Sequence, residues 1–197
     1  MTEIARRRRL PPSERRESIL AAALELFGAR SYSSVGMREI AEMSDLSATG
    51  IYRHFASKEA LLVGLFDRLS DQIAGAMREA SRLEGPRKQL AHLISFHVKM
   101  VVREPAVIPI YQRQDIDLPS EEFERFNGVL RDYLSAWTNP LLELDDTMPT
   151  DVARTTVVAT FGTMNGIAFH RSGLAPRALE KLITDLAWRT LGFPPDD

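Results

Sequence analysis

The segment LSATGIYRHFASKEAL, residues 46–61, combines small residues with hydrogen-bonding side chains over about four helical turns. Ala48, Thr49 and Gly50 would let the start of a helix approach another molecule closely. The hydroxyl and methyl groups of Thr49 can meet a base edge, a thymine methyl group or a phosphate. Arg53, one turn further on, can reach a guanine or a phosphate. These residue types at this spacing predict contact with DNA rather than covalent chemistry.

Polar-tipped side chains along the same segment extend the predicted contact surface. Tyr52 and His54 would lie on the flanks of a groove, where they suit phosphate contacts. Lys58 would lie in the first turn of the next helix, where a cation and free backbone N–H groups together form an anion site. The aromatic side chains could instead merely pack in a small bundle, as Ile51 and Phe55 are expected to do. The full predicted DNA-binding set is Arg38, Ser47, Ala48, Thr49, Gly50, Tyr52, Arg53, His54 and Lys58.

Four helices would position these residues. They are predicted over 13–30, 37–44 and 48–55, with a longer one from 58 onward. Ser13, Ser47 and Ser57 are good N-caps, because a serine hydroxyl accepts from a free N–H of the first turn. A turn through Asp45 and Leu46 separates the second and third helices. This arrangement is typical of a helix-turn-helix, in which the second helix lies in the major groove.

The remainder of the chain also has helical periodicity. Helices are predicted over 89–102, 120–137, 151–171 and 176–193. The segment 107–115 is expected to be a short element interrupted by Pro109, and 139–151 is predicted to be a loop. No alternating pattern predicts a strand. The expected fold class is therefore all-α with about nine helices. A flexible basic arm would cover 1–12, a three-helix helix-turn-helix domain 13–58, and a helical bundle 59–193.

Composition and charge narrow the possible functions. Hydrophobic residues make up 44% of the chain, and there is no cysteine, which excludes disulfides, thiolate metal sites and cysteine nucleophiles. No apolar run reaches the roughly 18 residues of a membrane span, so we expect a cytoplasmic protein with no membrane partner. Residues 1–58 hold ten basic and seven acidic residues, so they carry +3 and the remainder −5 of the net charge of −2. This asymmetry favours a polyanion partner for the N-terminal third.

The basic run Arg6–Arg9 has two interpretations. It is either an arm that follows the DNA backbone or enters the minor groove, or a solvated tail.

Several residues carry a resemblance to a known family. They are Ala22, Leu26 and Phe27 in the first helix, Ile40 and Ala41 in the second, and Leu46, Ser47, Tyr52, His54, Phe55, Lys58, Glu59 and Leu61 beyond them. With this spacing, residues 13–62 resemble the DNA-binding domain of the TetR family of bacterial regulators. Three positions depart from the family pattern. Ser31 and Thr49 stand where glycine is common, and Val35 and Gly36 stand where threonine or serine is usual.

The resemblance implies a homodimer that binds a palindromic operator and holds a ligand pocket in its C-terminal bundle. The bundle of residues 59–193 would then serve ligand binding and dimerisation. Small residues at three- and four-residue steps permit close helix approach, although burial within one subunit is the alternative. The predicted dimer interface comprises Ala159, Gly162, Thr163, Gly166, Leu182 and Leu186.

Pocket residues are predicted from polar or aromatic groups within apolar helices. They are His92, Phe96, His97, Met100, Tyr111, Gln112, Trp137, Asn165 and Phe169. His92 and His97 are five residues apart and point in different directions on a helix, so we expect no metal site and no cofactor. The segment EPAVIPIYQRQ resembles an actinobacterial subgroup linked with lipid and acyl-CoA metabolism, which implies a fatty acyl or acyl-CoA effector.

The expected function is a ligand-responsive transcriptional repressor that a small hydrophobic effector releases from DNA. The alternative is a constitutive or architectural DNA-binding regulator, which a bundle core without a pocket would favour. An enzyme is not expected, because the sequence has no zinc motif, no phosphate-binding glycine loop and no Ser-His-Asp arrangement in a strand-turn-helix setting.

Overall fold

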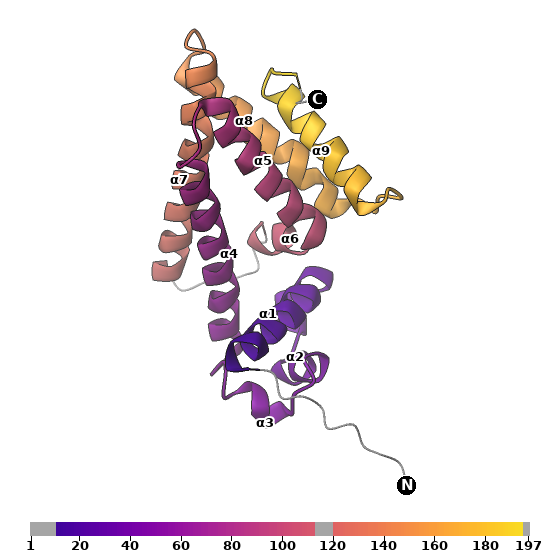
Figure 1. Cartoon of the computed structure of the whole chain (residues 1–197). Helices are drawn as coiled ribbons and strands as arrows, with labels where there is room; N and C mark the ends of the chain where they lie inside the picture. The colour runs from indigo at the N-terminus through magenta and orange to yellow at the C-terminus, as the bar shows by residue number, and fades with distance from the viewer. Residues whose placement is uncertain (1–10, 113–119, 195–197) are drawn as a thin grey trace.

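A computed structural model describes residues 11–112 and 120–194 of the chain (Figure 1). Within these ranges the fold has nine α-helices, two short 3-10 helices and no strand, so the predicted all-α class is confirmed. The α-helices are α1 (Pro12–Ala29), α2 (Met37–Met43), α3 (Ala48–Ile51), α4 (Lys58–Ala80), α5 (Pro86–Arg103), α6 (Val107–Tyr111), α7 (Ser120–Leu144), α8 (Thr150–Asn165) and α9 (Pro176–Thr190). The 3-10 helices are η1 (Tyr32–Ser34) and η2 (Gly166–Phe169).

Helices α1, α2 and α3 form a small unit at one end of the molecule, and α5 to α9 form a larger bundle at the other (Figure 1). The long helix α4 joins the two, because it packs against α1 and also against α5 and α7. The short helix α6 forms a second connection, since it packs against α1. Helix α3 lies at the end of the molecule that faces away from the bundle (Figure 1).

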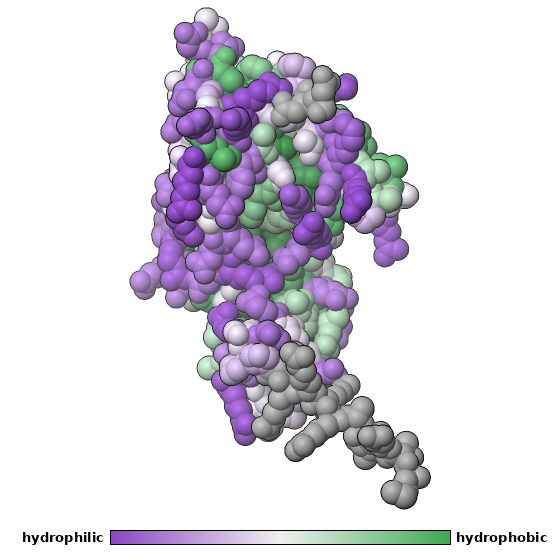
Figure 2. Space-filling view, in the orientation of Figure 1, coloured by the Kyte–Doolittle hydropathy of each residue, from purple (hydrophilic) through white to green (hydrophobic). Residues whose placement is uncertain are grey.

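The bundle core is built around α5, which contacts α4, α7, α8 and α9. Leu90, Leu93 and Ile94 of α5 are fully buried, as are Trp137 of α7 and Trp188 of α9. Each such side chain contributes about 1.5–3 kcal/mol of favourable burial. Hydrophobic residues also show in the middle of the bundle face in Figure 2, flanked by hydrophilic ones.

Helix α1 begins differently from the prediction. Pro11 is at the N-cap position and Pro12 is the first helical residue, so Ser13 lies inside the helix and makes no cap. Proline suits the first helical position because its missing N–H would have no partner there. Residues 1–10 of the predicted basic arm, which include Arg6–Arg9, lie outside the described residues.

Helix α7 runs seven residues further than predicted, through Pro140 to Leu144. A proline inside a helix removes one hydrogen bond and costs about 3 kcal/mol or more, which is why the sequence predicts a loop there. Here Pro140 is buried beside the fully buried Trp137 and Leu141. Packing of this turn into the core therefore offsets the lost hydrogen bond, and the prediction of a loop over 139–144 was wrong.

Ser31 has φ −62° in extended backbone, although glycine is common at this position in the resembling family. No left-handed conformation is needed there, so the serine fits without strain.

Candidate DNA-binding surface and bundle cavity

The turn between α2 and α3 is built by backbone hydrogen bonds that close the end of α2. Asp45 N–H donates to the Glu42 carbonyl (3.2 Å), and Leu46 N–H donates to the Ala41 carbonyl (2.8 Å). This pair of bonds is a Schellman motif, which requires a left-handed residue after the helix. Asp45 takes that conformation with φ +58°, and aspartate tolerates it better than most residues. The turn therefore fixes the direction in which α3 begins.

Helix α3 starts at the predicted cap. The Ser47 Oγ accepts from the Gly50 N–H at 3.0 Å, and Ile51 and Phe55 are buried as predicted. A Cβ at Gly50 would lie only 3.0 Å from the Ser47 Oγ, so the small residue keeps the cap intact. The helix is one turn long and continues as hydrogen-bonded turns to Phe55.

Most of the predicted DNA-binding side chains lie on the free side of α3. Ala48, Thr49 and Arg53 are exposed, and Tyr52 is 55% exposed, a large value for an aromatic residue. His54 and Gly50 are half-buried. The structure thus brings these residues to one outward surface of the small unit.

Two predicted DNA contacts have partners within the chain. Arg38 forms an exposed ion pair with Glu42 one turn further along α2 (2.9 Å). The Lys58 ammonium donates to the carbonyls of Tyr32 (2.9 Å) and Val35 (3.1 Å) and lies 4.3 Å from the centre of the Tyr32 ring. Lys58 therefore fastens the segment between α1 and α2 to the start of α4. The contact of Lys58 with DNA stays a prediction.

A cavity of about 200 Å³ lies within the bundle. Its walls come from α4, α5, α6, α7 and α8. The lining residues are Leu69, Ile73, His97, Met100, Val107, Ile108, Tyr111, Phe126, Leu130, Tyr133, Leu134, Val158, Phe161 and Asn165. None of these described lining residues is Asp, Glu, Lys or Arg. Val158 is 55% exposed, so the cavity reaches the surface beside α8.

A chain of hydrogen bonds crosses the polar part of the cavity wall. His97 Nε2 lies 2.8 Å from Asn165 Oδ1, and His97 Nδ1 lies 3.3 Å from the Tyr133 hydroxyl. The Asn165 Nδ2 donates to the Tyr111 hydroxyl at 3.2 Å. With the amide oxygen facing the ring, Nε2 donates to Asn165 and Nδ1 accepts from Tyr133. Each of these four side chains is thus hydrogen-bonded to at least one of the others.

The titratable side chains in this chain of hydrogen bonds, those of His97, Tyr111 and Tyr133, are held uncharged. Burial lowers the pKa of His97 to about 4, against a smaller opposite effect of its hydrogen bond to Asn165. Burial also raises the pKa values of Tyr111 and Tyr133 above the usual phenol value. The imidazole and both phenols are therefore neutral at neutral pH. Rings of Tyr133 and Phe161 stack nearly parallel to the imidazole, which keeps it out of water.

Four of the nine predicted pocket residues line the cavity: His97, Met100, Tyr111 and Asn165. The other five are not among the residues that line it. Trp137 and Phe96 lie behind the wall, where Trp137 packs edge-on against His97 and Phe96 edge-on against Tyr133. His92 faces away and lies 3.3 Å from Glu79. Gln112 is exposed at the end of α6, and Phe169 is 64% exposed in η2.

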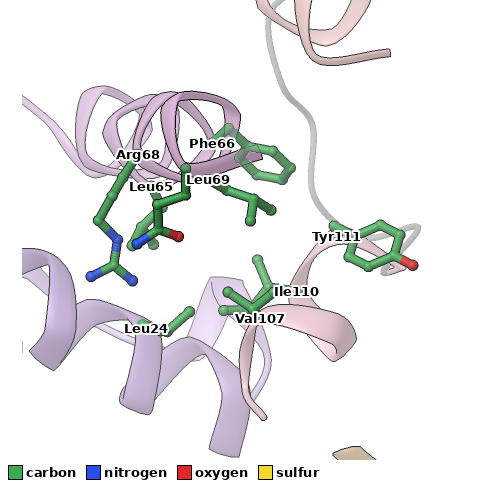
Figure 3. A pocket seen from close by; sticks show the side chains of 9 residues that line it. Leu24, Leu65, Phe66, Arg68, Leu69, Val107, Ile110 and Tyr111 are labelled. Carbon is green, nitrogen blue, oxygen red and sulfur yellow. The ribbon is translucent and has the colours of Figure 1, made fainter. Parts of the chain in front are cut away.

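A second, smaller pocket adjoins the cavity, with which it shares Leu69, Val107 and Tyr111, and it also reaches Leu24 of α1. Figure 3 shows Leu65 and Leu69 of α4 facing Val107 and Ile110 of α6, with Leu24 of α1 beneath them. The contact between α1 and α6 is tight, because a Cβ at Gly28 would lie 2.4 Å from the Ala106 Cβ. Helix α6 therefore touches the cavity on one side and α1 on the other.

Arg68 of α4 forms ion pairs with residues of α1 and of the end of α5. It donates to Glu104, at the end of α5, at 2.8 Å and lies 3.6 Å from Glu17 of α1. Its side chain is 13% exposed, and its Nε has no hydrogen-bond partner among the described residues. Figure 3 places Arg68 and Tyr111 on opposite sides of the apolar residues between them.

The predicted dimer residues lie on α8, at the start of η2 and on α9. Leu182 and Leu186 are exposed, as are Ala159, Gly162 and Gly166. Thr163 is half-buried. A Cβ at Gly162 or Gly166 would meet no atom within 4 Å, so this face is open in a single copy of the chain.

The described residues contain no group of three or more His, Asp or Glu residues placed to hold a metal ion. No helix in the described part of the chain combines the length and apolar character needed to cross a membrane.

Comparison with known proteins places the small unit in a family. Residues 19–65 match the family described as bacterial regulatory proteins, tetR family. The chain is 38% identical over 81 residues to the HTH-type transcriptional activator FasR of Mycolicibacterium smegmatis, covering 41% of this chain and 37% of that protein. It is 26% identical over 132 residues to the HTH-type transcriptional repressor KstR2 of Rhodococcus jostii, covering 66% and 64%. The chain thus matches between about a third and two thirds of these relatives' lengths.

The whole fold also matches solved structures. The structure of AibR in complex with isovaleryl coenzyme A and operator DNA superposes with a TM-score of 0.71 at 19% identity, covering 92% of this chain and all of that one. At this identity the likeness concerns the fold alone. The helix-turn-helix geometry and the family match together show that residues 19–65 form a helix-turn-helix domain of the tetR type.

Proposed function

We propose that the chain is a ligand-responsive repressor that binds a palindromic operator as a homodimer and is released by a small hydrophobic effector. The observation that carries this proposal is the position of α6. Val107, Ile108 and Tyr111 of this helix line the bundle cavity, and Ala106, which precedes it, touches Gly28 of α1. A molecule in the cavity therefore has only one short helix between itself and the DNA-binding unit.

Helix α4 offers a parallel route for the same signal. Leu69 and Ile73 line the cavity, whereas Leu61 and Leu62 lie fully buried at the end of α4 near α3. An effector that prefers the cavity in one setting of α4 and α6 would change the spacing of the two α3 helices in the dimer. A preference of about 1–3 kcal/mol changes operator affinity roughly 5- to 150-fold.

Dimerisation is proposed through α8 and α9. Their exposed face carries small residues that allow helices to approach, together with Leu182 and Leu186, which a second copy would cover. Two α3 helices in one dimer would then reach successive major grooves, about 34–36 Å apart.

The effector is proposed to be of the acyl type. The apolar cavity fits this class, and the fold is shared with AibR, whose solved structure holds isovaleryl coenzyme A. The cavity also weighs against a constitutive regulator, for which a filled bundle core was expected. FasR is named an activator and KstR2 a repressor. Transcription assays are therefore needed to test whether this protein represses or activates its target genes.

The test is a titration of the protein against the DNA that flanks its own gene, over a range of salt. Specific, palindrome-dependent binding should weaken steeply with salt, because bound cations are released from the DNA. Arg53→Ala should weaken specific binding roughly tenfold, while Arg131→Ala, an exposed arginine on α7, should not. Equal binding by Arg53→Ala and the parent protein would show that α3 does not lie in the groove.

A further inference from the structure

The described wall of the cavity is uncharged, and this limits the chemical class of effector that can bind there. This inference rests on the proposed function only in treating the cavity as the effector site. The described lining residues hold no charged side chain, and the imidazole of His97 is kept neutral by burial. A carboxylate or phosphate placed here would lose its water without gaining an opposite charge from any described lining residue, which is strongly unfavourable.

The nearby guanidinium of Arg68 does not supply that charge. It lines the neighbouring pocket and not the cavity. Leu65 and Leu69 lie between it and Tyr111 in Figure 3, and the group is already paired with Glu104 and Glu17. An anionic headgroup would have to break these pairs to use it.

Tyr111 offers the cavity one unused hydrogen-bond donor. Its hydroxyl oxygen accepts from Asn165 Nδ2 at 3.2 Å and more weakly from Gln112 Nε2 at 3.5 Å. Among the described residues, no acceptor lies within reach of the hydroxyl's own hydrogen. The other three residues, Tyr133, His97 and Asn165, are hydrogen-bonded to one another, and Asn165 orients the Tyr111 hydroxyl. A ligand oxygen that only accepts, such as a carbonyl, completes this arrangement.

The size of the cavity sets the size of the buried group. A closed apolar cavity of about 150 Å³ holds benzene, so a cavity of about 200 Å³ holds roughly eight to ten non-hydrogen atoms. Since the cavity reaches the surface beside Val158, a larger remainder of the molecule can stay outside.

We propose that the cavity binds an uncharged apolar group that carries a carbonyl oxygen, hydrogen-bonded by Tyr111, and rejects the free carboxylate of the same length. A ketone, an ester and an acyl thioester share this chemistry. A free fatty acid does not.

The test measures binding to the purified protein without DNA, by calorimetry, with 2-octanone and octanoate as the matched pair. The ketone should bind at least about a hundredfold more tightly than the carboxylate. Octanoyl-CoA shows whether the carbonyl belongs to a thioester or to a free neutral compound. Tighter binding of octanoyl-CoA than of 2-octanone identifies a thioester, and weaker binding identifies a free neutral compound. Equal or tighter binding of octanoate, or no binding of 2-octanone and octanoyl-CoA, would overturn the proposal.

Three variants locate the contact. Tyr111→Phe should weaken 2-octanone binding roughly three- to tenfold, the loss expected for one neutral hydrogen bond. Tyr32→Phe makes the same chemical change outside the cavity and should have no effect. Met100→Lys adds a cation to the wall and should shift the preference toward octanoate. An unchanged preference in Met100→Lys, or an unchanged affinity in Tyr111→Phe, would count against the proposal.

Release of operator DNA is then measured separately with the same compounds. Selective binding of the carbonyl compounds without release would refute the proposed effector mechanism and leave the cavity chemistry standing. Release of operator DNA by octanoate at the same concentrations as 2-octanone would refute the proposed cavity chemistry and leave the effector mechanism standing.

Discussion

The turn before α3 and the hydrogen-bond chain in the cavity are both small polar assemblies, yet they are held together in opposite ways. At the turn, the bonded pairs Asp45–Glu42, Leu46–Ala41 and Gly50–Ser47 are close neighbours in the chain, and the groups lie near the surface. In the cavity, the bonded pairs are 36, 54 and 68 residues apart, and His97 is buried. The turn is therefore specified by local backbone geometry, whereas the hydrogen-bond chain in the cavity exists only when the four helices α5, α6, α7 and α8 pack correctly.

This difference predicts where the protein is sensitive. A change at the turn should cost little more than one local bond. A change in the cavity chain or in the packing between helices should cost more, because it leaves buried groups without partners or forces helices apart.

The largest expected effect is on the pH dependence of stability. His97 has a pKa of about 4 in the folded protein and about 6.5 when unfolded. The unfolded chain therefore takes up a proton first as the pH falls. The contribution is fully present above pH 6.5 and is lost as the pH falls toward 4, by about 3 kcal/mol.

Denaturant unfolding at several pH values checks this expectation. His97→Gln keeps a hydrogen-bonding side chain that does not titrate, so its stability should fall less between pH 6.5 and 4. The same pH dependence in both proteins would show that His97 is not held neutral in the fold.

The next largest effect is expected at the contact between α1 and α6. Alanine at Gly28 would place a Cβ 2.4 Å from the Ala106 Cβ, so the helices must move apart. We expect a loss of about 1–3 kcal/mol in unfolding free energy, together with weaker coupling between effector and operator binding.

Gly75→Ala is the matched control. This glycine lies inside α4, and a Cβ there would meet only the end of the Arg78 side chain at 3.9 Å. It should stabilise the protein by about 0.5–1 kcal/mol, the usual gain of alanine over glycine in a helix. A stabilised Gly28→Ala protein would show that α1 and α6 have room to adjust.

The smallest effect is expected at the turn itself. Ser47→Ala removes the cap of α3 and should cost about 1 kcal/mol in thermal or denaturant unfolding. Ser47→Asp keeps a cap acceptor and should retain stability, while its negative charge should weaken binding to DNA. A loss above that of Gly28→Ala would contradict the view that the turn is locally specified.

Local geometry also explains how much the sequence could predict. Ser47 and Ser57 were identified as caps from their neighbours alone, and both accept the expected backbone hydrogen bond. The order of α1, α2 and α3 and the burial of Ile51 and Phe55 depend on the same short-range patterns.

The cavity required information that local patterns do not carry. Asn165 and Tyr111 meet because α6 packs against η2, which directly follows Asn165 at the end of α8. The residues near Asn165 in the sequence give no sign of Tyr111, and those near Tyr111 give none of Asn165. Tyr133 was missed because its spacing on α7 is that of an ordinary core residue. The sequence predicts Phe169 as an aromatic residue within an apolar helix, but the helix ends at Asn165 and the following 3-10 turn leaves Phe169 64% exposed.

The glycine at position 28 has a mechanical consequence. Where two helices meet through long side chains, a small shift of one helix is absorbed by a change of rotamer. Between Gly28 and Ala106 there is no side chain long enough to rotate. A displacement of α6 by a fraction of an ångström must therefore appear in α1 almost undiminished, which makes this contact a stiff link between the cavity and the DNA-binding surface.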